Sequence, residues 1–340
     1  MTADPAAWRL TPVPDEFTRV GTPVIATEDV PNCPVCHSSD HAEVAVGFDY
    51  ELLTCSNPWR FVQCSRCRHV WLNPRPAVAE LGVIYPPSYY AYNYSKINPI
   101  ARNAKERLDV RKIARIISEC PRQPSSYLDV GCGDGRFLRV VEKLGIQRTK
   151  LYGLELDQRV VDRLRSEGYP GVFCERVEDT SSLPEDGIDL ATMFHVIEHV
   201  DDPGTVVRQI RRWLSPGGVF ALETPNLDSL DARVFRRKYW GGYHIPRHWN
   251  LFTPASISRL LTENGFEVIA TVFQTGHSFW MYSLHHLVRY QGGSRPRAGE
   301  WFDPMKSLFG LASFTAFDLL RGTLGWKTSA MLVICRKPLS

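Results

Sequence analysis

The sequence predicts an α/β protein in which a parallel sheet is flanked by helices. From Ser126 onward, apolar runs of strand length alternate with segments of helical periodicity: YLDV, KLYGLE, GVFC, IDLATMF and GVFALE. Alternation of this kind is typical of parallel sheets with helical crossovers. Two cysteine pairs near the N-terminus predict a small separate ribbon. An apolar, aromatic insertion between about Gly276 and Gly325 predicts a helical cap before the last strand, SAMLVICRK.

Composition predicts five segments along the chain. The proline-rich residues 1–30 predict a tail, and residues 31–78 hold the paired cysteines. Residues 79–123 form a link in which an aromatic stretch, YPPSYYAYNY, precedes a helical run, AKERLDVRKIARIISEC. The α/β domain covers residues 124–275, and residues 276–340 form the cap and the final strand.

The totals limit the function classes. The 340 residues are 44% hydrophobic, which suits a packed globular protein, and the formal net charge of +3 does not favour a nucleic-acid partner. The opening stretch lacks the basic start and apolar core of a secretory signal, and no apolar run reaches transmembrane length. We therefore expect a cytoplasmic protein, with membrane association left open. The oligomeric state is not predicted.

A glycine-rich loop, GCGDG, joins the first strand of the domain to a helix. Gly131, Gly133 and Gly135 have the spacing G-x-G-x-G, whereas a dinucleotide site has G-x-G-x-x-G, and no Gly-Lys-Ser/Thr of a P-loop follows. Asp129 and Asp134 would repel a pyrophosphate but attract an ammonium group. Glu155 ends the next strand, where α/β sheets place the residue that binds ribose hydroxyls. These residues predict a ligand with a ribose and a cation; the alternative is a loop whose glycines only turn the chain.

Four stretches between residues 124 and 275 resemble the motifs of class I S-adenosylmethionine-dependent methyltransferases: LDVGCGDG, GLELD, IDLATMFHVIEHVDDP and LSPGGVFALETPN. The resemblance implies a Rossmann-like sheet and S-adenosylmethionine as the cofactor. It further implies a role for each of several residues. The Gly131–Gly135 loop packs against methionine and ribose, Asp129 lies near the methionine end, Glu155 binds both ribose hydroxyls, Glu178 or Asp179 lies by the adenine, and Phe194 and His195 close the pocket.

The paired cysteines, CPVC and CSRC, are Cys33, Cys36, Cys64 and Cys67. Two C-x-x-C pairs supply the four thiolates of a tetrahedral zinc site, and closed four-cysteine sites are structural. The alternatives are a ribbon that has lost its metal or four unrelated thiols, with His37 and His69 as substitute ligands. A redox role is weaker, because neither pair opens a helix in a βαβ unit.

The order of ribbon, link and domain resembles bacterial methyltransferases with an N-terminal zinc-binding region, among them deoxysugar C-methyltransferases. In those enzymes the ribbon and link cover the substrate. The resemblance implies that the link tyrosines, namely Tyr85, Tyr89, Tyr90 and Tyr92, border the acceptor pocket. The alternative is a tyrosine-rich packing seam.

Candidate catalytic residues follow the fifth strand, in WGGYHIPRHWNLFTPASI. His244 and His248 lie in a loop expected at the ligand-binding edge of the sheet. His248 matches the catalytic histidine of sugar C-methyltransferases, but Arg247 stands where their acid would be, which points away from C-methylation or toward an anionic substrate. We expect His248 to be a general base or an orienting group, the alternative being a loop histidine held by a backbone carbonyl.

A second cluster, HVIEH, resembles a metal-binding segment of ubiquinone-pathway O-methyltransferases, except that His195 replaces their first acid. Structural hydrogen bonds would also explain Glu198 and His199, and this structural interpretation is favoured over metal binding.

The sequence thus predicts methyl transfer to the oxygen or carbon of a small-molecule acceptor: a sugar, a lipid-linked glycan or a secondary metabolite. An apolar helix within residues 302–325 either contacts a membrane surface or is buried against the core. The alternatives are an RNA methyltransferase that uses the ribbon arginines, Arg60, Arg66, Arg68 and Arg75, and a cofactor-binding scaffold without activity.

Overall fold

The computed structural model describes residues 14, 17, 21–86, 99–290, 299–304 and 306–339, with the side chains of residues 99–105 excepted. Its contacts divide the chain into two compact units. The first contains Met1–Pro86, Pro225–Ile257 and Phe273–Met331, and the second contains Pro87–Thr224, Ser258–Val272 and Leu332–Ser340. The chain returns to each unit more than once, so residues far apart in sequence meet within each.

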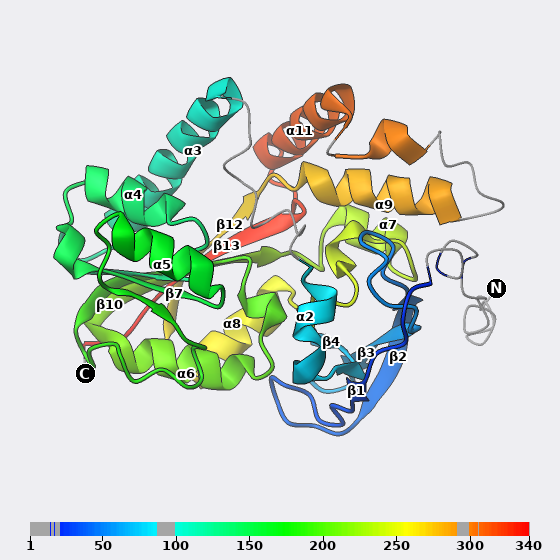
Figure 1. Cartoon of the computed structure of the whole chain (residues 1–340), viewed down its shortest axis with the longest axis horizontal. Coiled ribbons are helices and arrows are strands. Elements are labelled where there is room, and N and C mark those ends of the chain that lie inside the picture. Colours follow the sequence, from blue (N-terminus) through cyan, green and yellow to red (C-terminus); the bar gives the residue numbers. More distant parts are fainter. Residues whose placement is uncertain are drawn as a thin grey trace. The chain divides into compact units, whose positions relative to one another are not determined.

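The second unit is built on a seven-stranded sheet with the order β12-β13-β10-β9-β6-β7-β8. Figure 1 labels β7, β10, β12 and β13 of this sheet. Its strands are β6 (Tyr127–Val130), β7 (Leu151–Glu155), β8 (Val172–Cys174), β9 (Ile188–Phe194), β10 (Leu214–Pro225), β12 (Glu267–Gln274) and β13 (Ala330–Arg336). β6 pairs in parallel with β7 and β9, β7 with β8, and β9 with β10. The predicted α/β fold with a parallel sheet is confirmed.

Helices precede or connect these strands, and side-chain caps mark the starts of some of them. They are α3 (Pro99–Ser118), α4 (Arg136–Lys143), α5 (Gln158–Ser166), α6 (Pro203–Trp213) and α8 (Pro254–Glu263), with short 3₁₀ turns at Arg148–Lys150 and Ile197–His199. Asp157 accepts a hydrogen bond from the backbone N–H of Arg159 at the start of α5, and Asp202 accepts one from Thr205 at the start of α6. Such side chains satisfy N–H groups that a helix leaves unpaired. The chain passes between the two units within α8, β10, β12 and β13.

The first unit contains a four-stranded antiparallel sheet with the order β11-β4-β3-β2. Its strands are β2 (His41–Gly47), β3 (Trp59–Cys64), β4 (Val70–Leu72) and β11 (Asn250–Leu251), and β1 (Thr27–Glu28) pairs separately with β5 (Arg75–Pro76). Because β11 comes from the segment after the fifth strand of the other sheet, the ribbon and the loop with the candidate histidines share one unit. Their buried side chains form a common apolar core that includes Trp59, Phe61, Trp240 and Trp249.

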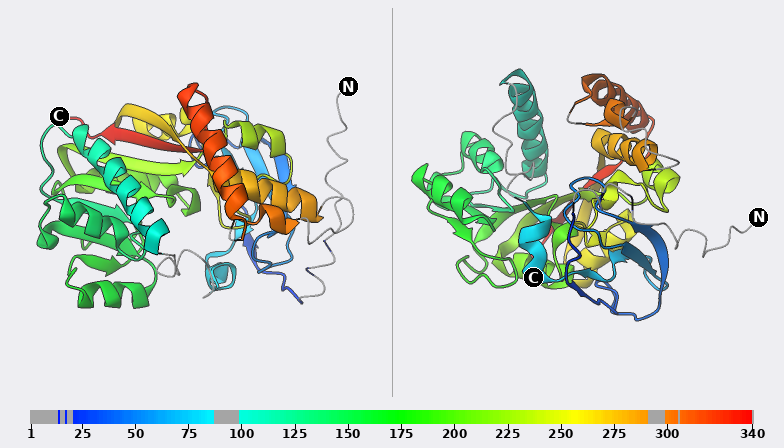
Figure 2. Two further views of the ribbon diagram at one scale, coloured as in Figure 1. Left: turned by 90° about the horizontal axis from the view of Figure 1, so that it is seen from above. Right: turned by 45° about the vertical axis from the view of Figure 1, so that its right-hand side comes forward.

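The helices of the first unit are α2 (Leu81–Ile84), α7 (Leu230–Phe235), α9 (His277–Tyr290) and α11 (Leu308–Thr323), with 3₁₀ turns at Val78–Glu80, Gly241–Tyr243 and Glu300–Phe302. α9 and α11 lie side by side before the final strand (Figures 1 and 2), as the predicted helical cap requires. Within the described ranges, no helix combines the length and the apolar character needed to cross a bilayer.

Candidate functional site

The glycine loop follows the carboxyl end of β6 and leads into α4. The N–H groups of Gly131 and Cys132 donate to the carbonyl of Leu154 at 2.8 and 3.0 Å, which joins the loop to β7. Gly131, Gly133 and Gly135 all have positive φ, a conformation that side chains rarely adopt. A Cβ on Gly131 would lie 2.4 Å from Val196, whereas one on Gly133 would meet no atom within 4 Å. The loop is therefore closely packed at Gly131 and open at Gly133.

Asp129 lies two residues before this loop with its side chain buried in the sheet. Its Oδ1 accepts a hydrogen bond from the Thr192 hydroxyl at 3.1 Å, and that hydroxyl is 2.6 Å from the Tyr127 hydroxyl. Its Oδ2 has no hydrogen-bond partner among the described residues. Burial raises the pKa of Asp129 to about 7, although Thr192 and Arg136 act in the opposite direction. A buried carboxylate oxygen without a partner suits a cationic donor such as the ammonium group of an amino acid.

Glu155 ends β7 beside the open part of the loop. Its Oε2 accepts from the N–H of Gly133 at 2.8 Å, and its Oε1 accepts from the N–H groups of Leu156 at 2.8 Å and Asp157 at 3.3 Å. These bonds hold the carboxylate in one orientation, and each oxygen can still accept a further bond. Together with the unpartnered oxygen of Asp129, these hydrogen-bond acceptors fit the amino and ribose groups of S-adenosylmethionine, which donate.

The two acids proposed for the adenine differ in exposure. The side chain of Asp179 is 76% exposed, whereas that of Glu178 is mostly buried, and burial raises the pKa of Glu178. Arg176 lies near both, with its Nη2 3.5 Å from Glu178, and also forms an ion pair with Asp201. Glu178 is therefore the more enclosed of the two candidates.

His195 follows β9 with a φ of +55° and lies between two carboxylates. Its Nδ1 is 3.2 Å from Glu198 and its Nε2 is 3.2 Å from Glu223, which also pairs with Lys112. Burial alone would lower the pKa of His195, but these two hydrogen bonds raise it to about 9. The ring is accordingly an imidazolium at neutral pH. The neighbouring Phe194 contacts Phe137 with ring centroids 4.6 Å apart.

Sequence reasoning missed Lys112 and Glu223. The position of Glu223 at the end of the run GVFALE, beside the strand that precedes His195, was a usable signal. Lys112 carries no such signal, because it comes from α3 and meets Glu223 only through the fold.

The four cysteines come together in the first unit. Their sulfur atoms all lie within 4.8 Å of one another, with Sγ to Sγ distances of 3.5 Å for Cys33–Cys67 and for Cys36–Cys64. Four thiolates about 2.3 Å from one zinc ion would be separated by about 3.8 Å, so the cluster is close to a zinc-binding arrangement.

The two cysteine turns also have matching backbone conformations. The N–H of His37 donates to the carbonyl of Cys33 at 2.9 Å, and the N–H of Arg68 donates to that of Cys64 at 3.1 Å. His37 and Arg68, each directly after a pair, have φ values of +58° and +64°. The N–H of Cys67 points at Sγ of Cys64, at 3.4 Å. Such N–H groups stabilise a thiolate, which is the form that binds metal. His69 is not among the clustered ligands; its Nε2 is 3.2 Å from Asn250.

The candidate histidines of the first unit have different partners. His244 Nδ1 lies 2.8 Å from Oε2 of Glu51, whereas His248 Nδ1 donates to the carbonyl of Gly242 at 2.8 Å. Their ring centroids are 5.0 Å apart, and the ring planes are inclined at 64° to each other. Glu51 is 193 residues from His244, so sequence reasoning had no local signal for this partner.

Arg247 is fully buried and paired with Asp49. Its Nη1 and Nη2 donate to the two carboxylate oxygens at 3.0 and 2.9 Å, and its Nε donates to the carbonyl of Ile84 at 2.7 Å. The anionic substrate suggested by Arg247 is therefore not supported, because a carboxylate of the protein already neutralises this cation. Among the link tyrosines, Tyr85 packs against the apolar core of the first unit, and Tyr89, Tyr90 and Tyr92 lie outside the described residues.

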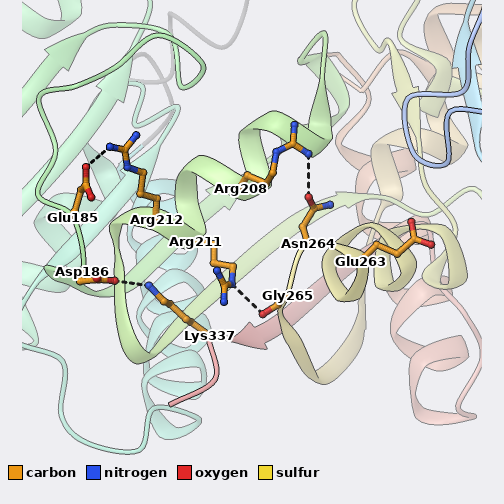
Figure 3. A pocket seen from close by; sticks show the side chains of 9 residues that line it. All are labelled: Glu185, Asp186, Arg208, Arg211, Arg212, Glu263, Asn264, Gly265 and Lys337. Atoms are coloured by element: carbon orange, nitrogen blue, oxygen red, sulfur yellow. Dashed lines mark hydrogen bonds and ion pairs between the residues drawn. The ribbon is translucent and has the colours of Figure 1, made fainter. Parts of the chain in front are cut away.

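A surface depression of about 610 Å³ lies elsewhere in the second unit (Figure 3). It is lined by residues just before β9, in α6, at the end of α8 and just after β13, at the end of the sheet opposite the glycine loop. Its cations are engaged: Arg208 donates to Asn264 and Arg211 to the carbonyl of Gly265, while Arg212 pairs with Glu185 and Lys337 with Asp186. The depression therefore has no unsatisfied charge to attract a ligand.

A family model described as a methyltransferase domain matches residues 100–271. The chain is 38% identical over 113 residues to an uncharacterized 37.1 kDa transposon protein of Streptomyces fradiae, covering 32% of each chain. It is 30% identical over 149 residues to a probable S-adenosylmethionine-dependent methyltransferase of Mycolicibacterium smegmatis, which covers 43% of this chain and 53% of that one. A ubiquinone biosynthesis O-methyltransferase of Xanthomonas oryzae is 33% identical over 111 residues, covering 29% and 42%.

The chain thus spans between about one third and one half of the length of these curated relatives. Among solved structures, a methyltransferase of Archaeoglobus fulgidus is 17% identical with a TM-score of 0.45, covering 68% of this chain and 94% of that one. The [4+2]-cyclase SpnF is 21% identical with a TM-score of 0.44, covering 70% and 82%.

Proposed function

The chain belongs to the class I S-adenosylmethionine-dependent methyltransferases, and from this premise we propose that it transfers the methyl group of S-adenosylmethionine to an oxygen or carbon atom of a small-molecule acceptor. The observation that carries the proposal is the buried Oδ2 of Asp129, which has no partner in the described part of the chain and lies two residues before the open glycine loop. A glycine loop that only turned the chain would not require a buried carboxylate oxygen without a hydrogen-bond partner, which costs free energy.

In this proposal the residues around the loop hold the cofactor. Asp129 pairs with its amino group, the Gly131–Gly135 loop, with Asp134, packs against the methionine and ribose, and Glu155 accepts from the ribose hydroxyls. Glu178, with Asp179 at the surface, borders the adenine, and Phe194 and His195 line the pocket. The cofactor supplies a methyl group on a sulfonium, which is already an activated leaving group, so placement of the acceptor is the main task of the protein.

We further propose that Cys33, Cys36, Cys64 and Cys67 bind one zinc ion that stabilises the first unit. The near-tetrahedral spacing and the matched backbone turns support this role. A closed four-cysteine site leaves no open position for chemistry, so the ion is structural.

His248 and His244 are the candidate acid–base groups in this proposal. Nδ1 of His248 lies beside the carbonyl of Gly242, and Nδ1 of His244 lies beside the carboxylate of Glu51. A carbonyl and an ionised carboxylate only accept hydrogen bonds, so each Nδ1 is the donor. In this proposal one of the two rings acts as the general base for a hydroxyl or carbon acid.

The acceptor is a sugar, a lipid-linked glycan or a secondary metabolite. The relatives in ubiquinone biosynthesis are O-methyltransferases by name, which supports an oxygen acceptor. Two of the ribbon arginines are already engaged: Arg75 pairs with Glu28 at 2.6 Å, and Arg60 lies 3.9 Å from Glu43. These pairs leave the RNA alternative with less basic surface than the sequence suggested.

The surface of α11 favours a lipid-linked acceptor or a membrane contact. Its only charged residues, Asp318 and Arg321, are buried and paired with each other at 2.9 Å. Its solvent face carries large apolar side chains, listed from the start of the helix: Leu308, Phe309, Phe317, Leu319, Leu320 and, just beyond its end, Leu324. A helix with its charges inward and its apolar residues outward suits an apolar surrounding.

Flotation with phosphatidylglycerol vesicles tests this contact. We expect the full chain to float and the double variant Leu308→Gln, Leu320→Gln to remain at the bottom of the gradient. Val234→Gln, at an exposed apolar position of α7, is the matched control and should float like the wild type. Equal flotation of all three proteins, or none, would contradict a contact through α11.

The main experiment combines native mass spectrometry, calorimetry and an acceptor screen. We expect one zinc ion per chain, saturable binding of S-adenosylmethionine, and release of S-adenosylhomocysteine when nucleotide sugars, glycolipids or quinone precursors are supplied. Asp129→Asn should weaken cofactor binding, and Asp162→Asn on α5 should not. Cofactor binding without turnover on any acceptor would favour the scaffold alternative, and absence of cofactor binding would refute the proposal.

A further inference from the structure

Four charged side chains form a continuous network at the carboxyl end of β9, and all four belong to the second unit. Lys112 pairs with Glu223. Oε1 of Glu223 lies 3.2 Å from Nε2 of His195, and Nδ1 of His195 lies 3.2 Å from Glu198. We call this set the His195 network. Burial would lower the pKa of His195, but the two carboxylates raise it to about 9, so the ring is protonated at pH 7 and two cations face two carboxylates.

His195 is the most exposed member of the network. Its side chain is 44% exposed, whereas those of Glu198 and Glu223 are 0% and 8% exposed. Both ring nitrogens point to these buried carboxylates, so the part of the ring that can face a ligand consists of carbon atoms. Such a ring can pack against a ligand, but its two N–H donors are already engaged. The network therefore orients the ring and does not supply an acid or a base.

The network holds a strained turn after β9. His195 has a φ of +55°, a conformation that residues other than glycine rarely adopt and that surrounding interactions must maintain. Its N–H donates to the backbone carbonyl of Glu223 at 2.8 Å, so β10 fixes both its backbone and its ring. Lys112, from α3, lies over the ring of the preceding Phe194, 5.1 Å from the ring centroid. Helix α3 and strand β10 thus hold this turn in one conformation.

The same turn packs directly on the glycine loop. Val196, the residue after His195, occupies the space that a Cβ on Gly131 would need. Phe194, the residue before it, contacts Phe137 in the first turn of α4, with ring centroids 4.6 Å apart. Because protein interiors are closely packed, a shift of this turn would displace the loop or leave a gap beside it. The position of the glycine loop therefore depends on the network.

The balance of charge in the network matters for a cationic cofactor. S-adenosylmethionine carries a sulfonium, and an uncompensated imidazolium beside its pocket would repel it. Loss of the Glu223 carboxylate would leave two cations with one carboxylate, whereas loss of the Lys112 ammonium would leave an excess of negative charge. S-adenosylhomocysteine has a neutral sulfur, so these changes should alter the binding of the cofactor relative to that of the product.

On the premise of the proposed function, we propose that the His195 network positions the glycine loop for the cofactor and balances the charge beside the sulfonium. Lys112 and Glu223 are then positioning residues that act through the turn from Phe194 to Val196, without a contact of their own to the cofactor. Loss of either residue should weaken the binding of both cofactor and product. The two losses should change the preference for the sulfonium in opposite directions.

Calorimetric titration of the full chain with S-adenosylmethionine and with S-adenosylhomocysteine tests both parts. We expect Lys112→Met and Glu223→Gln each to raise the dissociation constant for the product about tenfold, because each breaks a charged hydrogen bond of the network. The ratio of the constant for the cofactor to that for the product should rise about threefold in Glu223→Gln and fall about threefold in Lys112→Met. Lys112→Arg keeps the charge and should leave this ratio unchanged.

Asp189→Asn is the matched control. Asp189 lies near the opposite end of β9 and accepts hydrogen bonds from the hydroxyls of Ser125 and Ser215, so this variant removes a hydrogen-bonded carboxylate away from the loop. We expect it to lower the melting temperature and to leave both dissociation constants unchanged. Equal weakening of binding by this control would show an effect of general stability and would overturn the proposal. Unchanged constants in Lys112→Met and Glu223→Gln would also overturn it.

A second measurement needs no ligand. The dipeptide Cys-Gly occurs once in the sequence, so labelling with ¹³C-carbonyl cysteine and ¹⁵N-glycine isolates the amide of Gly133, whose N–H donates to Glu155. We expect this NMR signal to shift in Lys112→Met and to stay in place in Asp189→Asn. An unmoved signal in Lys112→Met would contradict the positioning role. If the signal shifts but the wild type binds neither ligand, the failure lies in the proposed function and not in the contact of the network with the loop.

Discussion

Arg247 and Asp49 form a two-pronged ion pair across 198 residues of sequence, and neither side chain is exposed to solvent. The carboxylate also accepts from the hydroxyl of Thr54 at 2.6 Å, so both charges are enclosed and satisfied. The pair ties the N-terminal ribbon to the loop that carries His244 and His248.

Removal of one member should therefore destabilise the protein strongly. We expect Asp49→Asn to lower the free energy of unfolding by about 3–5 kcal/mol, because it leaves a buried guanidinium without its counter-charge. Arg247→Lys should not preserve stability, since one ammonium cannot replace two parallel N–H donors. Urea unfolding followed by tryptophan fluorescence measures both. Glu263→Gln, at an exposed pair, is the control, and equal midpoints for Asp49→Asn and this control would contradict the prediction.

Loss of the metal should unfold the first unit selectively. Because binding of zinc by folded ligands stabilises the folded state, Cys36→Ser should abolish the bound zinc. It should also lower the melting temperature by roughly 6–12 °C, which corresponds to about 3 kcal/mol. Cys174→Ser, outside the cluster, should retain the ion. Calorimetry with metal analysis checks this, and a zinc-free wild type of unchanged stability would contradict it.

Cofactor affinity should depend on pH through Asp129. Its pKa, raised to about 7 by burial, lies above the ordinary value of 3.8, so the empty site holds a proton in weakly acidic solution. A bound ammonium group requires the ionised carboxylate. We therefore expect the affinity for S-adenosylmethionine to rise by up to about tenfold between pH 5.5 and 6.5 and to level off above about pH 7. Calorimetric titrations at several pH values test this.

Asp129→Asn should give weaker binding without this pH dependence. If the wild-type affinity is the same at pH 5.5 and 7.5, the ionisation of Asp129 is not coupled to binding.

Stability in alkaline solution should depend on His195. Its pKa is raised from 6.5 to about 9 by Glu198 and Glu223, against the effect of burial, so the folded state binds the proton more tightly than the unfolded state does. The resulting stabilisation is complete below pH 6.5 and is lost as the pH rises through about 9. Because the side chain is 44% exposed, solvent reduces the effect.

We expect the melting temperature of the wild type to fall between pH 6.5 and 9.5 by more than that of His195→Asn. Glu223→Gln should also reduce the pH dependence, because it removes one of the two carboxylates. If the melting temperatures of the wild type and His195→Asn change with pH in parallel, the imidazolium form of His195 does not stabilise the fold.

Local patterns in the sequence were sufficient to predict the features that depend on neighbouring residues. The glycine spacing after YLDV predicted a tight loop, and Gly131, Gly133 and Gly135 indeed have positive φ. The C-x-x-C spacing predicted paired thiols, because two cysteines three apart lie in one turn. Alternating apolar runs predicted the parallel sheet, since burial on both faces selects continuous apolar strands.

Tertiary structure alone decided the partners of the charged groups. Glu51 meets His244, Asp49 meets Arg247, and Lys112 meets Glu223, across 193, 198 and 111 residues. Nothing in the spacing of these residues indicates a contact, because ion pairing has no sequence period and depends on which segments the fold brings together. The sequence therefore determined the fold class and the positions of the loop and the thiols. The tertiary structure decided which histidine is backed by a carboxylate and which cation is already neutralised, because burial makes an unpaired charge costly and so selects its partner.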